Sequence, residues 1–121
     1  MSLWVWVGVA LLGGLGAIGR FLLDARIAGH AEWDFPLGTL TVNATGALLL
    51  GLLTGLAIKG DALVLAGTAT LGSYTTFSTW MLESHRLAED AEIPSAILNV
   101  LLSLAIGVGA AVLGRGLGTH L

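Results

Sequence analysis

The chain has 121 residues, of which 55% are hydrophobic and 11% are charged, and its mean hydropathy is +0.90. A soluble domain of this size cannot bury so much apolar surface, so the excess must face lipid, and what remains is too short for a separate catalytic domain. The net charge of −3 and the lack of cysteine exclude a basic nucleic-acid-binding face, disulfides and thiolate chemistry.

Four apolar stretches are long enough to cross a bilayer as helices, which takes about 20 residues each. We therefore expect an all-α integral membrane protein: one domain over residues 1–121 with four transmembrane helices. The predicted spans are residues 3–23, 37–58, 62–82 and 96–113.

The first span has an aromatic start and a basic end. Trp4 and Trp6 suit one membrane interface, and Arg20 is placed to extend its guanidinium toward the other. A polar connection over residues 24–36 follows, and Pro36 is positioned to start the second helix.

The second span carries a polar residue at its centre. Asn43 lies one helical turn after Thr39, so both project from one face. Two interpretations stay open: Asn43 forms a hydrogen bond to a neighbouring helix, or it lines a polar pathway. Gly51 and Gly55 form a GxxxG pair suited to close helix packing, although glycine is frequent in membrane helices.

The third span follows a short turn at residues 59–61 and is poor helix material. Seven Ser or Thr residues lie between Thr68 and Thr79, and their hydroxyls compete for backbone partners. We expect a break around residues 72–76. Irregular backbone at membrane depth is tolerated where it is buried in protein, lines a cavity or binds an ion, and freed carbonyls suit a cation such as sodium.

Two aromatic residues follow this predicted break. Phe77 and Trp80 are three residues apart and share a helical face, so their ring edges either stabilise an anion weakly or simply pack. Glu83 lies one turn beyond Thr79, and its position favours a vestibule or end-cap residue over a buried proton carrier.

The fourth span, like the second, carries a polar pair and pairs of small residues. Asn99 and Ser103 are one turn apart and form either a polar stripe or an interhelical hydrogen bond. The small-residue pairs of this span are Ala105 with Gly109 and Ala110 with Gly114.

The basic residues do not orient the bundle. Lys59 and Arg115 fall on one side, and Arg26 and Arg86 fall on the other, with Arg20 added if it extends there. Because orientation follows the excess of Lys and Arg on one side, this near tie predicts that the chain inserts both ways and pairs as an antiparallel dimer.

Three motifs resemble the CrcB/Fluc family of fluoride channels, in order and over nearly the whole chain. They are GAIGRF (16–21), FPLGTLTVNATGALLLG (35–51) and GSYTTFSTWMLES (72–84). The resemblance implies a fluoride-selective channel that exports fluoride passively across a prokaryotic inner membrane. It also implies an antiparallel, dual-topology homodimer with two pores and a broken third helix.

The resemblance further implies roles for single residues. Gly72 and Thr75 would hold a structural sodium ion through their carbonyls, provided by both subunits. Arg20 matches the family arginine, with a role in the vestibule or in the structure. At position 80 the family commonly has Phe, so Trp80 either presents a ring edge to the anion, donates its indole N–H or packs. Asn43 and Phe77 match pore residues of the family. Together with residues singled out above from the sequence itself, the expected anion pathway comprises Asn43, Phe77, Trp80, Ser78, Thr79, Thr39, Ser103 and Glu83.

Other functional classes are weaker. A small multidrug exporter needs a carboxylate within the membrane, and Glu83 is the one candidate, at the edge of a span. A structural membrane protein without transport activity would explain the glycines but not the hydroxyls. No set of catalytic residues indicates an enzyme. The sequence leaves open a heterodimer with a homologous chain.

Overall fold

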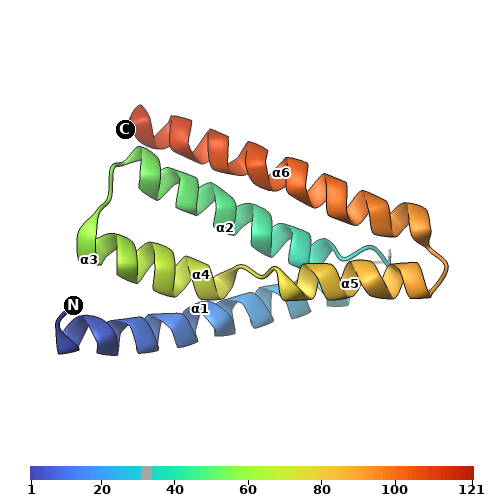
Figure 1. Cartoon of the computed structure of the whole chain (residues 1–121), viewed down its shortest axis with the longest axis horizontal. Helices are drawn as coiled ribbons and strands as arrows, with labels where there is room; N and C mark the ends of the chain where they lie inside the picture. The colour runs from blue at the N-terminus through green and yellow to red at the C-terminus, as the bar shows by residue number, and fades with distance from the viewer. Residues whose placement is uncertain (31–33) are drawn as a thin grey trace.

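The computed structural model describes residues 1–30 and 34–121, and all regular structure in those residues is helical. The elements are α1 (Leu3–His30), α2 (Leu37–Gly55), α3 (Gly60–Leu63), the π-helix η1 (Val64–Leu71), α4 (Gly72–Tyr74), α5 (Ser78–Glu89) and α6 (Ile93–Thr119). Figure 1 shows them side by side along one long axis. Both termini and the α2–α3 turn lie at one end, and the α5–α6 turn lies at the other.

Three of the described helices are long and apolar enough to cross a membrane, namely α1, α2 and α6. This agrees with the membrane protein that the composition predicts. Two helices exceed the predicted spans, because α1 continues to His30 and α6 runs from Ile93 to Thr119. The connection expected to begin at Asp24 is thus helical as far as His30. Glu32 and Trp33 in that connection lie outside the described residues.

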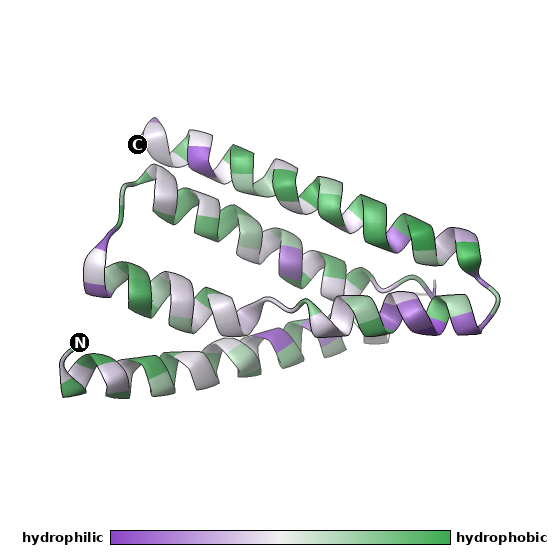
Figure 2. Cartoon of the chain, in the orientation of Figure 1, coloured by the Kyte–Doolittle hydropathy of each residue, from purple (hydrophilic) through white to green (hydrophobic). Residues whose placement is uncertain are grey.

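The apolar side chains point mainly outward. Trp4 is 80% exposed, whereas Val42 is completely buried against neighbouring helices. Figure 2 shows hydrophobic residues along α1, α2 and α6, and hydrophilic ones gathered in α5 toward its turn into α6. This distribution is the reverse of a soluble domain and suits a lipid environment.

Glycines bring α2 and α6 into backbone contact. A Cβ on Gly51 would lie 2.2 Å from the Ala111 carbonyl oxygen, and one on Gly114 would lie 2.0 Å from that of Leu48. Gly55 packs in the same way against Arg115. By contrast, Gly109 has no atom within 4 Å of its Cβ position, so the pair it forms with Ala105 makes no such contact within the chain.

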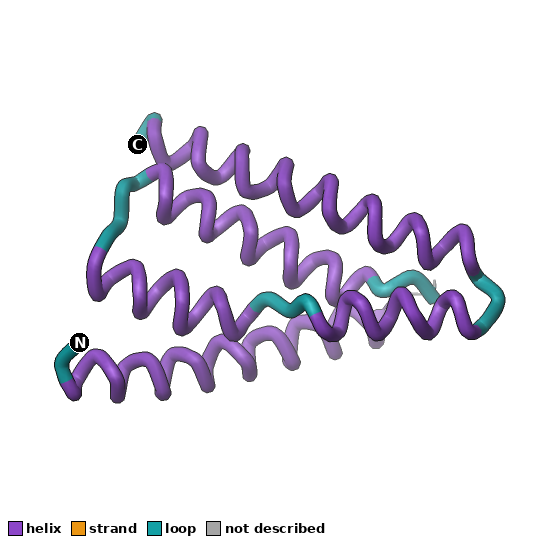
Figure 3. Tube along the Cα trace, in the orientation of Figure 1, coloured by secondary structure: helices purple, strands orange, loops and turns teal. Residues whose placement is uncertain are grey.

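The third predicted span is broken, as the sequence indicates, but later in the chain. Helical structure ends with α4 at Tyr74 and resumes with α5 at Ser78, so the break covers residues 75–77. Gly72 keeps helical angles, because the Thr75 N–H still donates to the Leu71 carbonyl at 3.0 Å. Figure 3 shows the interruption as a loop halfway along the bundle.

The π-helix η1 before the break was not expected. The Thr70 hydroxyl donates to the Leu65 carbonyl five residues earlier at 2.7 Å, which suits the wide π turn. Gly16 of α1 lets the Thr70 carbonyl approach, since a Cβ there would lie 2.3 Å from its oxygen.

Candidate functional site

Asn43 of α2 forms hydrogen bonds to the backbone at the helix break. Its Nδ2 donates to the Thr76 carbonyl at 2.8 Å, and its Oδ1 accepts the Thr76 N–H at 2.8 Å. One side chain therefore replaces the helical partners that Thr76 loses at the break. Asn43 also lines a groove, so the hydrogen-bonding role is present and the pathway role stays a prediction.

The break redirects two N–H groups away from the carbonyls they would bind in a continuous helix. The Thr76 N–H, which would bind the Gly72 carbonyl, donates to Asn43. The Thr79 N–H, which would bind the Thr75 carbonyl, donates to the Thr76 hydroxyl at 3.2 Å. The carbonyls of Gly72 and Thr75 are thus separated from their helical donors, and both residues line the groove.

This groove has a volume of about 770 Å³ and lies between α2, the broken run from η1 to α5, and α6. Most of its wall is apolar. Its polar and aromatic lining includes Asn43, Thr75, Thr76, Phe77, Trp80 and Ser103. Residues from three separate predicted spans therefore meet at one surface.

Phe77 and Trp80 form an aromatic pair in this groove. Their ring centroids are 5.7 Å apart and their planes are at 89°. Phe77 is 69% exposed in the single chain, whereas Trp80 is half-buried. The Trp80 indole N–H donates to the Asn99 carbonyl at 3.2 Å, so its one hydrogen-bond donor is already used by the protein.

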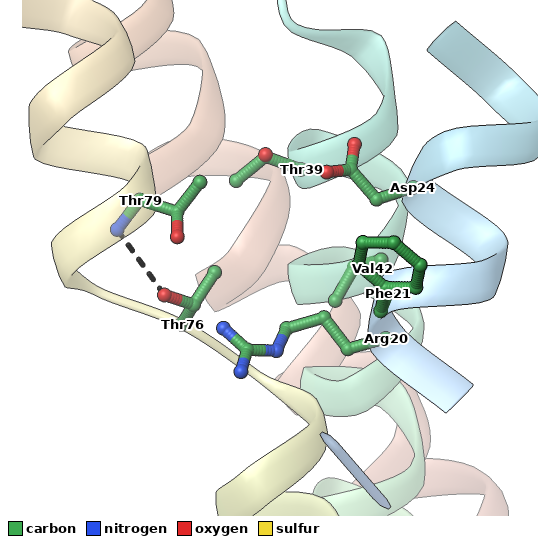
Figure 4. A pocket seen from close by; sticks show the side chains of 7 residues that line it. All are labelled: Arg20, Phe21, Asp24, Thr39, Val42, Thr76 and Thr79. Atoms are coloured by element: carbon green, nitrogen blue, oxygen red, sulfur yellow. Dashed lines mark hydrogen bonds between the residues drawn. The ribbon is translucent and has the colours of Figure 1, made fainter. Parts of the chain in front are cut away.

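A second cavity, of about 190 Å³, lies beside the break (Figure 4). Arg20 extends from α1 toward Thr76 and Thr79, and its Nε is buried without a hydrogen-bond partner among the described residues. A guanidinium beside hydroxyls suits an anion. The lining is Arg20, Phe21, Asp24, Thr39, Val42, Thr76 and Thr79.

The two cavities share Thr76, so the groove and the Arg20 cavity adjoin at the break. Thr39 continues this polar series toward the α5–α6 end, because its hydroxyl donates to the Glu83 carboxylate. Glu83 in turn lines a surface cavity of about 280 Å³ with Asp34, Pro36, Arg86, Leu87, Asp90 and Glu92. Glu83 therefore lies at an end of the series, among charged residues.

Most of the predicted site residues lie along this series. Asn43, Phe77, Trp80 and Ser103 line the groove, and Thr39, Thr79 and Arg20 line the cavity beside it. Ser78 is exposed at the start of α5. The sequence analysis missed Ser84, whose hydroxyl donates to the Trp80 carbonyl at 2.9 Å. Its position one turn after Trp80 was the available signal.

Comparison with known proteins gives one family. The model of the family described as CrcB-like protein, Camphor Resistance (CrcB), matches residues 7–115. A Mycobacterium tuberculosis protein named fluoride-specific ion channel FluC 2 is 54% identical over 111 residues, which cover 92% of this chain and 88% of the relative. A Symbiobacterium thermophilum protein named fluoride-specific ion channel FluC 1 is 44% identical over 121 residues, which cover 95% of this chain and 96% of the relative.

Proposed function

The chain belongs to the CrcB-like family, and on that premise we propose that it is a fluoride-selective channel that carries fluoride passively out of the cell. The observation that carries the proposal is the break in the third span. There, Asn43 bonds the interrupted backbone at Thr76, beside a groove that also contains the aromatic pair. An ion channel also agrees with the expectation that the protein is no enzyme.

Fluoride is small and strongly hydrated, so a pathway must replace its water with hydrogen-bond donors. The amide of Asn43 has two N–H donors, and one of them is used on Thr76. Because Asn43 lines the groove, we assign the other N–H to the ion. The ring edges of Phe77 and Trp80 carry partial positive charge and add a weaker attraction. Several weak binding sites, one after another along the pathway, allow the ion to leave as well as to enter.

The Arg20 cavity extends this route toward the protein surface. Because Thr76 lines both cavities, an anion that leaves the groove meets the hydroxyls of Thr76 and Thr79 beside the guanidinium of Arg20. Thr39 and Glu83 follow at the far end of the cavity. We assign Glu83 to the mouth of the route, where its carboxylate accepts the Thr39 hydroxyl.

A second copy of the chain completes the pathway in this proposal. The groove is open on one side, so in a single chain an ion beside Phe77 would meet lipid. An antiparallel partner would cover it and supply a second set of the same residues. The balanced basic residues support insertion in both orientations. Both termini lie at one end, which requires an even number of crossings and is consistent with the four predicted spans. The proposed location is a prokaryotic inner membrane, with self-pairing as the primary assembly and a homologous partner chain as the alternative.

The residues at the break fit a structural sodium ion. Gly72 and Thr75 have carbonyls separated from their helical donors, and carbonyl oxygens are hard ligands suited to such a cation. One chain offers two of these oxygens at the groove, so two chains would offer twice as many. In this arrangement the ion would fix the break and join the subunits.

Passive efflux from liposomes tests the function. The purified protein is reconstituted without a pH gradient, charge is balanced by potassium with valinomycin, and an ion electrode records fluoride and then chloride. Rapid fluoride release with negligible chloride release is the expected result. Absence of both from protein shown to be dimeric would contradict the channel. Fluoride release that needs a proton gradient would favour a coupled exporter instead.

A further inference from the structure

Trp80 is attached to α6 at two points. Its indole N–H donates to the backbone carbonyl of Asn99 at 3.2 Å. Its own backbone carbonyl accepts the Ser84 hydroxyl at 2.9 Å, and Ser84 accepts the side-chain amide of Asn99 at 2.8 Å. The ring and the backbone of Trp80 are therefore both connected to one residue, Asn99.

These connections involve three of the four buried polar side chains among the described residues. Asn99 is 1% exposed, and Ser84 and Ser103 are also buried. The Asn99 amide is satisfied at both ends, because its Oδ1 accepts the Ser103 hydroxyl at 3.2 Å. A buried amide with both ends bonded is rigid, since each lost hydrogen bond would leave a polar atom without a partner.

We propose that Asn99 is a positioning residue for Trp80: with Ser84 it fixes the indole so that the ring carbons, and not the N–H, are presented to the groove beside Phe77. This inference rests on the proposed function, because it assigns the ring to the fluoride route. Of the three roles open for Trp80, donation of its N–H to the ion is the one that this arrangement removes.

The arrangement has a physical consequence for conduction. A free indole N–H in an apolar groove would bind fluoride strongly at one place, and tight binding at one site slows release. With the N–H bound to Asn99, the aromatic pair offers only the weak attraction of ring edges. Residues that never touch the ion thus set how strongly the groove holds it.

The test combines fluorescence with fluoride efflux on the full-length protein. The chain has four tryptophans, and replacing the other three with Phe leaves Trp80 as the single indole fluorophore. In that background Asn99→Ala is compared with Thr119→Ala, which removes an exposed hydroxyl at the end of α6. Asn99→Ala keeps the backbone carbonyl that accepts the indole N–H and removes the side-chain amide that donates to Ser84. We expect it to loosen the α5–α6 contact that seats the ring, to lower the anisotropy of Trp80 emission and to change the fluoride efflux rate about fivefold. Thr119→Ala should leave both unchanged.

A double-mutant comparison separates positioning from general structural damage. If Asn99 acts through the indole, Asn99→Ala should change efflux by less than about twofold when Trp80 is already Phe. An equal change in both backgrounds would overturn the proposal, as would unaltered anisotropy. If Asn99→Ala does not assemble, Ser84→Ala removes the same bridge and is measured in its place. Wild-type liposomes without fluoride efflux would refute the channel, while the anisotropy comparison would still decide whether Asn99 holds the ring.

Discussion

Phe77 is the residue whose ring is most directly exposed to the proposed route. It is 69% exposed and forms no hydrogen bond through its side chain, yet it meets Trp80 at a right angle. Phe77→Ile keeps an apolar side chain and removes the ring quadrupole, so fluoride efflux should fall about tenfold or more while the dimer persists. Electrode recordings measure the rate and cross-linking measures the dimer.

Trp4→Ile is the matched control for Phe77→Ile, since it replaces an exposed ring at the chain's first turn and far from the break. Its efflux rate should stay close to that of the unaltered protein. Equal rates for Phe77→Ile and the unaltered protein would remove Phe77 from the pathway.

The sequence predicts which residues are functional candidates better than it predicts the groups to which they form hydrogen bonds. Asn43 stood out because a central amide is costly in a membrane helix, but its hydrogen bonds to the backbone N–H and carbonyl of Thr76 are known only from the fold. The same holds for Trp80. The sequence leaves three roles for its indole, and the distance to Asn99 decides where the N–H points. Partners far apart in sequence carry no local signal.

At the scale of the elements, the packing of α2 on α6 depends on glycine at particular positions. Gly114→Ala would place a Cβ 2.0 Å from the Leu48 carbonyl oxygen, so the helices would have to separate. We expect a loss of about 1–3 kcal/mol in stability, measured as a lower melting temperature in detergent.

Gly116→Ala provides the control on the same helix, because nothing lies within 4 Å of its Cβ position. Alanine favours helix over glycine, so this variant should melt at the same temperature or slightly higher. An equal fall in melting temperature for both variants would show that the loss of close packing at Gly114 does not cause the destabilisation.

The broken element shows which parts of the fold local sequence determines. The run of hydroxyls around Gly72 predicts an interruption, and one occurs at residues 75–77. The break starts later than predicted because the Thr75 N–H still donates to the Leu71 carbonyl, as in a helix. The π-helix before it was not predictable, since its wide turns accompany close packing against α1 at Gly16.

The break also gives a prediction about sodium. If the Gly72 and Thr75 carbonyls hold a sodium ion between subunits, replacing sodium with N-methylglucamine should lower the melting temperature and the dimer fraction. A ligand present at about a hundredfold over its dissociation constant contributes about 2.7 kcal/mol, which thermal melting resolves. Identical melting curves and dimer fractions in the two solutions would contradict a structural sodium.

At the scale of the whole molecule, the distribution of basic residues predicts two orientations in the membrane. Lys and Arg are nearly balanced between the two sides, so the chain should insert both ways. A reporter on the C-terminus should therefore be detected on both faces of the membrane in comparable amounts. Detection on one face alone would refute dual topology.

The membrane character of the molecule follows directly from composition, because so much apolar surface cannot be buried in a small domain. The enclosure of the groove does not follow from composition. The residues that line it come from α2, the broken run and α6, and one chain leaves them open on one side. In the proposed antiparallel dimer, a second copy would cover them.

In the proposed function fluoride passes along the break at Asn43, and Asn43→Asp tests this route. The substitution removes the donor to the Thr76 carbonyl and adds a negative charge to the groove. Thr119→Asp adds the same charge at an exposed site. Fluoride efflux from liposomes should be abolished in dimeric Asn43→Asp and retained in Thr119→Asp. Efflux from Asn43→Asp at the rate of the unaltered protein would contradict the claim and place the pathway elsewhere.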